Sequence, residues 1–410
     1  VLRHYSCQIY LQAAQGRVDR SFSPSIVLFI YELRLVTIRY NWFIPMERKL
    51  KIIVGWVTKH NYALALVIAA CFVALTLGLG HYSNQTIPPN QDHNARYLAE
   101  PGTHLDFMSE WDGPHYIQIA QHGYSNKSLT AFFPLYPLAI RLVMFMVSSP
   151  LLSALIVSWL ALAGSLWFYF KILKECLKQD RTGALQGLLL FLFFPTGVFL
   201  AATYSESLFA FLSLGAIYFG LKNRYLATGI MMGLATAARP DGLFVVALGA
   251  LLLWEARAKL RQIVIAAAIG CSGIIGYIAY LSVEFHKPFA FVSAQKQHIK
   301  WLSSRFISAF YNSTTPMSVV LFVVALYTVI YWWNKRLSFA IFGLLFVLLP
   351  LASGNFAGYP RYLLIDFPLQ LMLLNKFKNS RLGYALVLML SVIGWAYFTM
   401  HYAAGYTGGS

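Results

Sequence analysis

The chain has 410 residues, of which 58% are hydrophobic and 11% charged, and its mean hydropathy is +0.59. Soluble domains carry about 25% charged residues, so this composition excludes a soluble globular protein and indicates a polytopic helical membrane protein. The net charge of +17 fits Lys and Arg gathered in cytoplasmic loops better than nucleic-acid binding. The four cysteines lie far apart and predict neither a disulfide framework nor a zinc site.

Residues 1–45 show no helical periodicity, no long apolar run and no signal-peptide pattern. We expect them to be an N-terminal extension of uncertain order, or to lie upstream of a start at Met46. Met46 opens "MERKLKIIVGWVTKHNY", a basic cytoplasmic lead-in to the first span. Residues 46–410 are expected to form one membrane-embedded domain, with no internal repeat and no separable soluble domain.

Apolar runs of about 18 residues or more, long enough to cross a bilayer, recur after the basic lead-in. With the N-terminus in the cytoplasm, the first span covers about 62–81 and a long outer loop follows over about 83–134. The run "FPLYPLAIRLVMFMVSSP" is predicted to be a short or re-entrant helix at the outer face. As a full span it would place the next basic segment outside, against the positive-inside rule.

The rest of the chain alternates apolar runs with short basic loops, and gives an all-α protein with about eleven transmembrane helices. The remaining spans are expected near 151–170, 184–204, 206–221, 225–238, 242–255, 262–283, 317–333, 337–352, 361–374 and 383–403.

Only 15 acidic residues occur in the chain, so their positions are informative. Six of them lie near the predicted outer face, in the first outer loop or at the outer ends of spans, and two arginines lie there as well. The acids are Asp106, Glu110, Asp112, Glu206, Asp241 and Asp366, and the arginines are Arg239 and Arg361. Ionisable residues at membrane depth are costly and usually mark a site or a pathway, so this set predicts a functional site at the outer face.

The residue types limit the chemistry of this site. The sequence has no Walker loop, no Ser–His–Asp order that stands out and no Cys/His metal spacing. Arginine pairs with phosphate through two parallel hydrogen bonds, and a carboxylate can take a proton from an attacking hydroxyl. Carboxylates beside arginines therefore suit a substrate that carries a phosphate and a hydroxyl.

The stretch "FMSEWDGPHYIQIAQHGY" in the first outer loop is the most polar part of the apolar region. If it is helical, Asp112, His115 and Tyr116 share one face, because they are spaced i, i+3 and i+4. Trp111 suits the membrane interface, where indole rings are favoured. The alternative is an amphipathic interfacial helix without chemistry.

Four segments in this order, "EWDGPHYIQIAQHGY", "AFFPLYPLAIRL", "FFPTGVFLAATYSESLFAFLSLGAIY" and "GLATAARPDGL", resemble the GPI mannosyltransferase PIG-V family and its prokaryotic relatives. That family belongs to the GT-C glycosyltransferases. The resemblance runs from about Tyr62 to "PRYLLIDFP" and implies a GT-C-like fold. It also implies an α-mannosyltransferase that uses polyprenyl-phosphate mannose and inverts the anomeric carbon at the extracytoplasmic or lumenal face.

The resemblance implies roles for individual residues. Asp112 would be the general base, with Glu110 and His115 as further candidate catalytic residues. The candidate substrate-binding residues are Trp111, Tyr116, Glu206, Arg239, Arg361 and Tyr362. Among them, the two arginines would hold the lipid phosphate and the glutamate would orient one of them.

We expect no cofactor and no divalent metal, since phosphate can leave against arginines. The expected partners are a polyprenyl- or dolichyl-phosphate-linked sugar donor, a glycolipid, glycan or protein acceptor, and membrane lipid, with no nucleic acid. The expected place is a prokaryotic cell membrane, or the ER membrane in a eukaryote. The sequence carries no signal for the oligomeric state.

Three alternatives remain open on the sequence. A GT-C transferase of another sugar would have the same architecture. A transporter of lipid-linked saccharides would favour paired halves with charges near the midplane, whereas here the acids gather at one surface. A membrane subunit without catalysis predicts that loss of the Asp112 carboxylate changes little.

Overall fold

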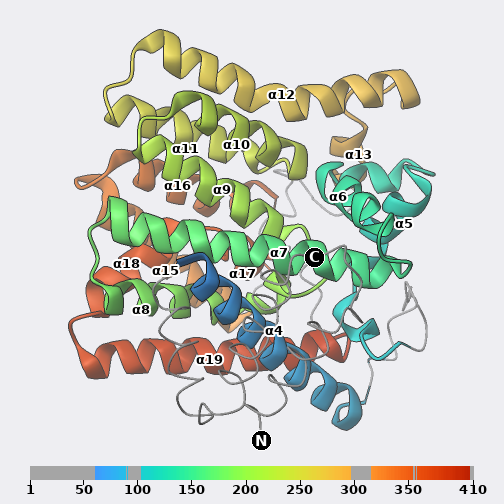
Figure 1. Ribbon diagram of the computed structural model, residues 1–410, viewed down its shortest axis with the longest axis horizontal. Coiled ribbons are helices and arrows are strands. Elements are labelled where there is room, and N and C mark those ends of the chain that lie inside the picture. Colours follow the sequence, from blue (N-terminus) through green and yellow to red (C-terminus); the bar gives the residue numbers. More distant parts are fainter. Residues whose placement is uncertain are drawn as a thin grey trace, which may run out of the picture. The chain divides into compact units, whose positions relative to one another are not determined.

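The computed structural model describes residues 61–88, 90, 103–296, 315–353, 356 and 358–406. The chain divides into the units Val1–Asn61 and Tyr62–Ser410, and the helical fold belongs to the second unit. The predicted extension over residues 1–45 lies outside the described residues. The described part consists of helices joined by turns and short irregular segments (Figure 1).

The helices follow one another along the chain with short connections between most of them. In order they are α4 (Asn61–Thr86), η1 (Asp106–Met108), α5 (Gly113–His122), η2 (Ser128–Ala131), α6 (Leu135–Met144), α7 (Pro150–Lys171), η3 (Ile172–Cys176), α8 (Arg181–Leu192), η4 (Gly197–Leu200), α9 (Glu206–Leu221), α10 (Tyr225–Ala238), α11 (Gly242–Glu255), α12 (Leu260–Phe285), α13 (Ala290–Lys296), α15 (Pro316–Trp333), α16 (Leu337–Ser353), α17 (Tyr359–Leu363), α18 (Phe367–Phe377) and α19 (Arg381–Ala403).

The all-helical class predicted from the sequence is confirmed for the described residues. Among the described residues, five helices are long and apolar enough to cross a bilayer: α4, α7 with its continuation η3, α12, α15 and α19. Helices α9, α10, α11 and α16 are apolar but shorter. The predicted count of eleven spans is therefore not established by length and composition.

One predicted span, 184–204, is wrong as a continuous helix. Helix α8 ends at Leu192, and the chain continues to Ser205 through turns and η4. Pro195 cannot continue the hydrogen-bond ladder, and a Cβ on Gly197 would overlap the carbonyl oxygen of Leu192. Most of this segment is buried, as irregular backbone at membrane depth must be.

The predicted span 361–374 is interrupted as well. Helix α17 ends at Leu363 and α18 begins at Phe367, with the fully buried Asp366 between them. Pro368 stands in the first turn of α18, where its missing amide proton costs nothing. The break places Arg361 on a short, separate helix.

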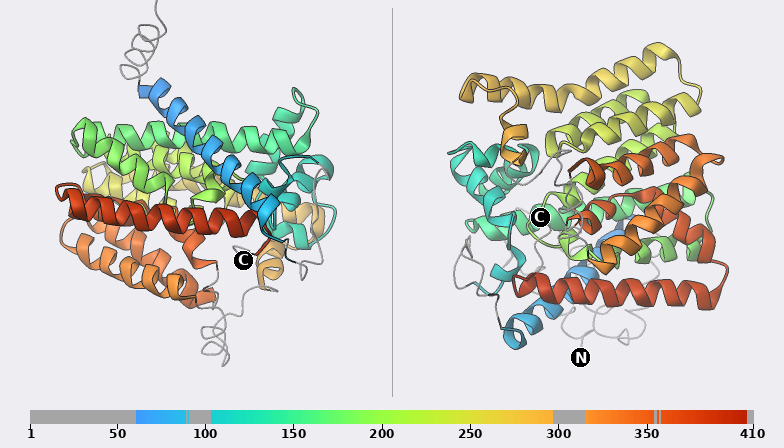
Figure 2. Two further views of the ribbon diagram at one scale, coloured as in Figure 1. Left: turned by 90° about the horizontal axis from the view of Figure 1, so that it is seen from below. Right: turned by 180° about the vertical axis from the view of Figure 1, so that it is seen from behind.

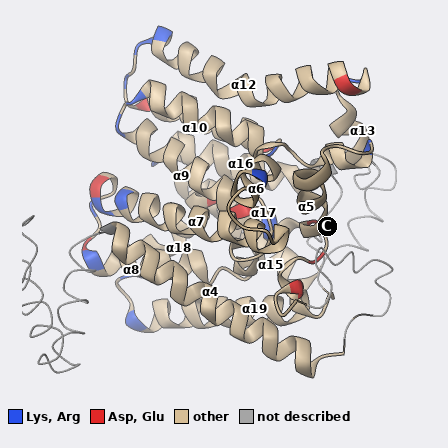
Figure 3. Ribbon diagram, turned by 45° about the vertical axis from the view of Figure 1, so that its right-hand side comes forward, with Lys and Arg blue, Asp and Glu red and all other residues tan. Residues whose placement is uncertain are grey.

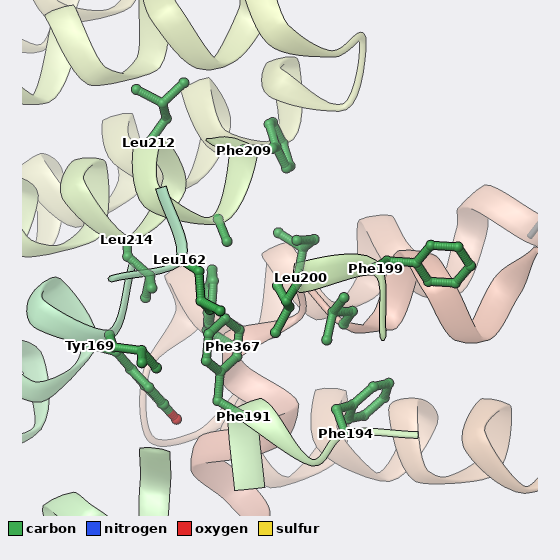
Figure 4. Close-up of a cluster of buried hydrophobic side chains, with 14 of the residues drawn as sticks. Leu162, Tyr169, Phe191, Phe194, Phe199, Leu200, Phe209, Leu212, Leu214 and Phe367 are labelled. Carbon is green, nitrogen blue, oxygen red and sulfur yellow. The ribbon is translucent and has the colours of Figure 1, made fainter. Parts of the chain in front are cut away.

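The core is rich in aromatic side chains contributed by α7, α8, α9, α18 and the segment around η4 (Figure 4). Phe367 at the start of α18 packs against Phe191 and Tyr169, with ring centroids 5.7 and 5.9 Å apart. Phe199 continues this core toward Tyr204, at 4.9 Å between centroids. The aromatic packing therefore fixes the irregular segment against the regular helices.

Helix α4, the first described helix, crosses α19, the last one (Figure 2). Phe72 of α4 and Trp395 of α19 are in contact, with ring centroids 5.8 Å apart. Further along, the Ser83 hydroxyl donates to the carbonyl oxygen of Met400 at 2.6 Å. These contacts bring the start of the first outer loop beside the end of α19.

The predicted short helix after the first outer loop is present as α6. Its buried face carries Tyr136, whose hydroxyl lies 2.7 Å from the Ser158 hydroxyl on α7. Its exposed side carries Leu138, Arg141 and Leu142, and the strongly exposed Phe145 and Met146 follow directly after its end. Such a helix suits a membrane interface.

The basic loops lie at one end of the helices (Figure 3). Lys222 at the end of α9 pairs with Glu175 of η3 at 3.3 Å. Arg336 before α16 pairs with Glu255 at the end of α11 at 3.4 Å. Lys378 after α18 donates to the Gln179 side chain at 2.6 Å. The loops predicted to face the cytoplasm therefore meet on one side.

Candidate active site

Five charged side chains form one continuous network at the helix ends opposite the basic loops. Asp112 pairs with Arg361, Arg361 with Glu206, Glu206 with Arg239, and Arg239 with Asp241. They come from the start of α5, from α17, from the first residue of α9 and from the α10–α11 turn. Three carboxylates and two guanidiniums alternate along the network.

Glu206 is the centre of this network. Its side chain is fully buried, and its Oε1 atom accepts from Arg239 Nη1 at 2.6 Å and also from Arg361 Nε. As the first residue of α9 it lies at the positive end of that helix dipole, which favours a carboxylate. Glu206 therefore holds both arginines in place from the protein side.

Arg361 links the buried centre to the more open end of the network. Its Nη1 atom donates to Asp112 Oδ2 at 2.7 Å. The Asp112 side chain is 31% exposed, whereas the Arg361 side chain is 8% exposed. Asp112 is thus the most accessible carboxylate of the network.

Arg239 closes the other end of the network. Its Nε and Nη2 atoms both approach Asp241 Oδ2 at 3.1 Å, and its guanidinium lies 5.8 Å from the Tyr362 ring centroid. Burial acts against the charge of Arg239, but Asp241 and Glu206 more than offset it and hold the pKa above its usual value. Arg239 is therefore a permanent cation in this site.

The loop that carries Asp112 is held by two buried tyrosines. The Tyr204 hydroxyl donates to the Glu110 carbonyl at 2.9 Å and accepts from the Asp112 amide at 3.2 Å. The Tyr402 hydroxyl accepts from the Glu110 amide at 3.1 Å and donates to the Met108 carbonyl at 3.3 Å. The backbone position of the candidate base thus depends on residues far away in the sequence.

Trp111 lies between Glu110 and Asp112 in this loop and has φ +59°. A bulky side chain in this left-handed region is a backbone outlier, and such outliers persist only where the surroundings enforce them. The next residue but one, Gly113, has no room for a side chain, because a Cβ there would overlap Thr203 Oγ1 and lie 2.8 Å from Ser109 Oγ. The loop is tightly packed on the segment before α9.

The other predicted site residues lie around the network. Glu110 is buried at 3% exposure, and half-buried His115 packs on Phe132 with ring centroids 5.1 Å apart. Tyr116 is 5% exposed and its hydroxyl lies 3.0 Å from that of Ser205, so in this structure its ring is part of the core. Burial raises the pKa of Tyr116, helped by Glu206 and Asp112, so Tyr116 stays neutral.

Two acids highlighted in the sequence take no part in the ion pairs of this network. The Asp106 carboxylate, at the first residue of η1, accepts from the Thr103 hydroxyl at 2.7 Å and from the Thr103 amide at 3.2 Å. Asp366 lies buried at the α17–α18 break. Conversely, sequence reasoning missed the roles of Tyr204 and Tyr402. Tyr204 stands in one of the four quoted segments, but nothing in the sequence marks either hydroxyl as a support of this loop.

The fold and this network define a helical membrane protein with a buried arginine–carboxylate site at one end of its helices. Comparison with known proteins finds a family match over part of the chain. Residues 89–267 match the family model described as Mannosyltransferase (PIG-V). The predicted resemblance to that family is thereby confirmed over this segment, which holds every residue of the network except Arg361.

Curated relatives carry matching names. GPI alpha-1,6-mannosyltransferase 2 of Cricetulus griseus is 37% identical over 218 residues, which are 47% of this chain and 42% of the relative. The Homo sapiens protein of that name is 34% identical over 192 residues, 41% and 38% of the two chains. GPI mannosyltransferase 2 of Drosophila melanogaster is 29% identical over 171 residues, 38% of each. The chain spans less than half the length of these relatives.

Proposed function

We propose that this chain is a membrane mannosyltransferase that moves a mannosyl group from a polyprenyl-phosphate donor to a hydroxyl of a glycolipid acceptor. The observation that carries the proposal is the pairing of Asp112, the accessible carboxylate, with an arginine fixed by the buried Glu206. Four of the five network residues lie in the segment that matches the PIG-V family. The names of the relatives support an intermediate of GPI-anchor synthesis as the acceptor and an α-1,6 linkage as the product.

The reaction uses the groups that the network provides. The acceptor oxygen attacks the anomeric carbon of mannose, and the bond from that carbon to the phosphate oxygen breaks on the opposite face. The polyprenyl phosphate leaves with the electron pair, and the acceptor hydroxyl gives its proton to the Asp112 carboxylate. The anomeric carbon is inverted, and all atoms and charges are accounted for without a metal or a cofactor.

Arg361 and Arg239 stabilise the leaving phosphate in this scheme. The negative charge on phosphate grows as the bond to the sugar breaks, so cations fixed beforehand stabilise the transition state more than the ground state. Glu206 prevents the two guanidiniums from moving toward water or lipid. The donor phosphate competes with the Asp112 carboxylate for Arg361, so donor binding releases Asp112 to act as base.

The same proposal places the molecule in its membrane. The GT-C-like topology of about eleven spans puts the N-terminus and the basic loops in the cytoplasm and the network at the lumenal face. The gathering of Lys and Arg at the opposite helix ends (Figure 3) supports this orientation through the positive-inside rule. The relatives' names favour the ER membrane.

The test compares the protein with its Asp112→Asn variant in detergent, supplied with polyprenyl-phosphate mannose and a lipid extract that contains GPI precursors. Release of polyprenyl phosphate and formation of mannosylated lipid are followed by mass spectrometry. We expect Asp112→Asn to lower turnover by about 100-fold or more, within the range for loss of a general base.

Asp106→Asn is the matched control, because Asp106 lies in the same loop and its carboxylate bonds to Thr103. This variant should keep its turnover within about twofold of that of the unchanged protein. Full turnover in Asp112→Asn would exclude this residue as the base. If the unchanged protein releases no sugar from the donor, the transferase proposal fails and transport of lipid-linked saccharide becomes the hypothesis to test.

A further inference from the structure

Tyr204 contacts both members of the ion pair that the proposed reaction uses. Its hydroxyl bridges the Glu110 carbonyl and the Asp112 amide, at 2.9 and 3.2 Å. Its ring faces the guanidinium of Arg361, whose Cζ atom is 4.6 Å from the ring centroid. One fully buried side chain therefore sets the position of the carboxylate and of the cation together.

The Tyr204 hydroxyl joins backbone groups on either side of Trp111. The two bonded backbone groups belong to the residues on either side of Trp111, which has φ +59°. Released from the bridge, this backbone would relax toward an ordinary conformation, because the left-handed region disfavours a bulky side chain. Such a relaxation would turn the chain just before Asp112 and move its carboxylate.

Tyr402 supports the same loop from the end of α19. Its hydroxyl accepts from the Glu110 amide at 3.1 Å, and its ring packs edge-on against Tyr204 with centroids 6.0 Å apart. Through these contacts α19, which holds none of the network's charges, supports the loop that carries Asp112. Tyr402 touches the loop further from Asp112 than Tyr204 does.

Packing alone does not account for the Tyr204 hydroxyl. Tyr169 provides the comparison, since its ring is also fully buried but its hydroxyl has no hydrogen-bond partner among the described residues. Phenylalanine would fill the site of Tyr169 equally well. At Tyr204, both the proton and a lone pair of the hydroxyl are used, and both bonds end on the loop that carries Asp112.

We propose that Tyr204 is a positioning residue that holds Asp112 in line with the acceptor hydroxyl, with Tyr402 as a second support. The inference rests on the proposed mannosyl transfer, because it assigns a role within that reaction. A displacement of about 1 Å in a catalytic group can lower the rate about 100-fold. The hydroxyl therefore matters for the rate of the chemical step more than for donor binding.

The test uses Tyr204→Phe, with Tyr169→Phe as the matched control, in the mannosyl-transfer assay with purified protein. We expect Tyr204→Phe to lower kcat by about 10- to 100-fold and to change the KM for polyprenyl-phosphate mannose by less than about threefold, because the ring stays against Arg361. Tyr169→Phe should leave both quantities unchanged. Tyr402→Phe should lower kcat by a smaller factor than Tyr204→Phe.

A double-mutant cycle separates positioning from a general loss of structure. If Tyr204 acts through Asp112, then adding Tyr204→Phe to Asp112→Asn should lower the residual rate by less than about twofold, since interacting residues are non-additive. Effects that multiply in the double variant would contradict the inference. An unchanged kcat in Tyr204→Phe would also contradict it. The same holds if the Tyr204→Phe protein no longer elutes from a size-exclusion column at the position of the folded protein.

These outcomes also distinguish the two proposals. If Asp112→Asn is inactive while Tyr204→Phe and Tyr402→Phe match the unchanged protein, mannosyl transfer stands and the positioning role of Tyr204 is rejected. If the unchanged protein transfers no mannose, the proposed function fails first and the positioning role falls with it.

Discussion

Glu206 has its whole side chain buried and one oxygen shared by two arginines. Taking such charges out of water costs free energy that their attraction often fails to recover, so a buried ion pair is weak evidence of stability. Removing one partner is costly, because it leaves a buried charge without compensation. Without the Glu206 charge, two buried guanidiniums lose their shared partner and each keeps a single carboxylate, Asp112 for Arg361 and Asp241 for Arg239, which suits a residue kept for function.

We therefore expect Glu206→Gln to lower the free energy of unfolding by about 1.5–3 kcal/mol, the range for hydrogen bonds to charged groups. Mannosyl transfer should fall by at least about tenfold, because both arginines lose their fixed partner. Chemical unfolding in detergent and the transfer assay measure the two effects.

Glu255→Gln is the control for this change. Glu255 pairs with Arg336 at 3.4 Å at the other end of the helices, and the two side chains are 21% and 32% exposed. A partly exposed pair of this kind contributes about 0–1 kcal/mol. Equal losses of stability in Glu206→Gln and Glu255→Gln would show that Glu206 is not specially placed.

At the scale of residues, the sequence predicts the charged members of the site well. Acids are scarce in this chain, so Asp112, Glu206 and the two arginines stand out, and the structure joins them in one network. Tyr204 could not be predicted, because its role depends on backbone atoms 92 and 94 residues away. A tyrosine in an apolar segment is otherwise an ordinary core residue.

At the scale of elements, α10 and α12 are in close backbone contact at glycines of both helices. A Cβ on Gly273 would overlap the Gly233 carbonyl oxygen and lie 2.8 Å from Thr236 Oγ1. The Thr236 hydroxyl also donates to the Gly270 carbonyl across the helix pair at 2.7 Å. Small residues let helix backbones approach in this way, and polar bonds across the contact support it in a membrane.

Gly273→Ala should therefore lower stability by about 1–3 kcal/mol, because overpacking forces the helices apart. Gly276 on the same helix is the control, since a Cβ there would meet nothing within 4 Å. Gly276→Ala should be neutral or stabilising by about 0.5–1 kcal/mol, the helix preference for alanine. Thermal unfolding of both variants in one detergent measures the difference, and equal midpoints would show that the close contact is absent.

The sequence predicts the regular elements better than their interruptions. Helices α9, α10 and α11 begin and end at the residues predicted from the apolar runs and the loops between them. The irregular segment 193–205 and the break at Asp366 were both predicted as parts of spans. Buried irregular backbone in a membrane protein can be as apolar as a helix, so hydropathy alone does not distinguish the two. The local signals are Pro195 with Gly197 in the first segment and Asp366 with Pro368 in the second.

At the scale of the whole unit, successive helices run between a basic end and the end that holds the network. Helix α9 begins at Glu206 in the network and ends beside Lys222, which pairs with Glu175. Helix α10 returns to Arg239, and α11 leads back to Glu255. This alternation separates the cluster of carboxylates and arginines from the basic loops by the length of the helices.

The separation can be tested by cysteine labelling in sealed microsomes. The background protein has its native cysteines Cys7, Cys71, Cys176 and Cys271 replaced, and single cysteines are then introduced as Lys127→Cys and Arg224→Cys. Both positions are exposed; Lys127 lies in the segment after α5, the helix that Asp112 precedes, and Arg224 lies in the α9–α10 turn. Because the positive-inside rule places the basic turn in the cytoplasm, an impermeant maleimide should label Arg224→Cys at once.

Lys127→Cys should react only after the vesicles are opened with detergent, because the proposed orientation puts its loop on the lumenal side together with Asp112. Labelling of both proteins after denaturation confirms that each cysteine is reactive, and retained mannosyl transfer confirms that each variant is folded. If both cysteines react in sealed vesicles, the site and the basic loops share one side of the membrane. The alternating helices would then not cross the bilayer between these loops, and a lumenal active site would be excluded.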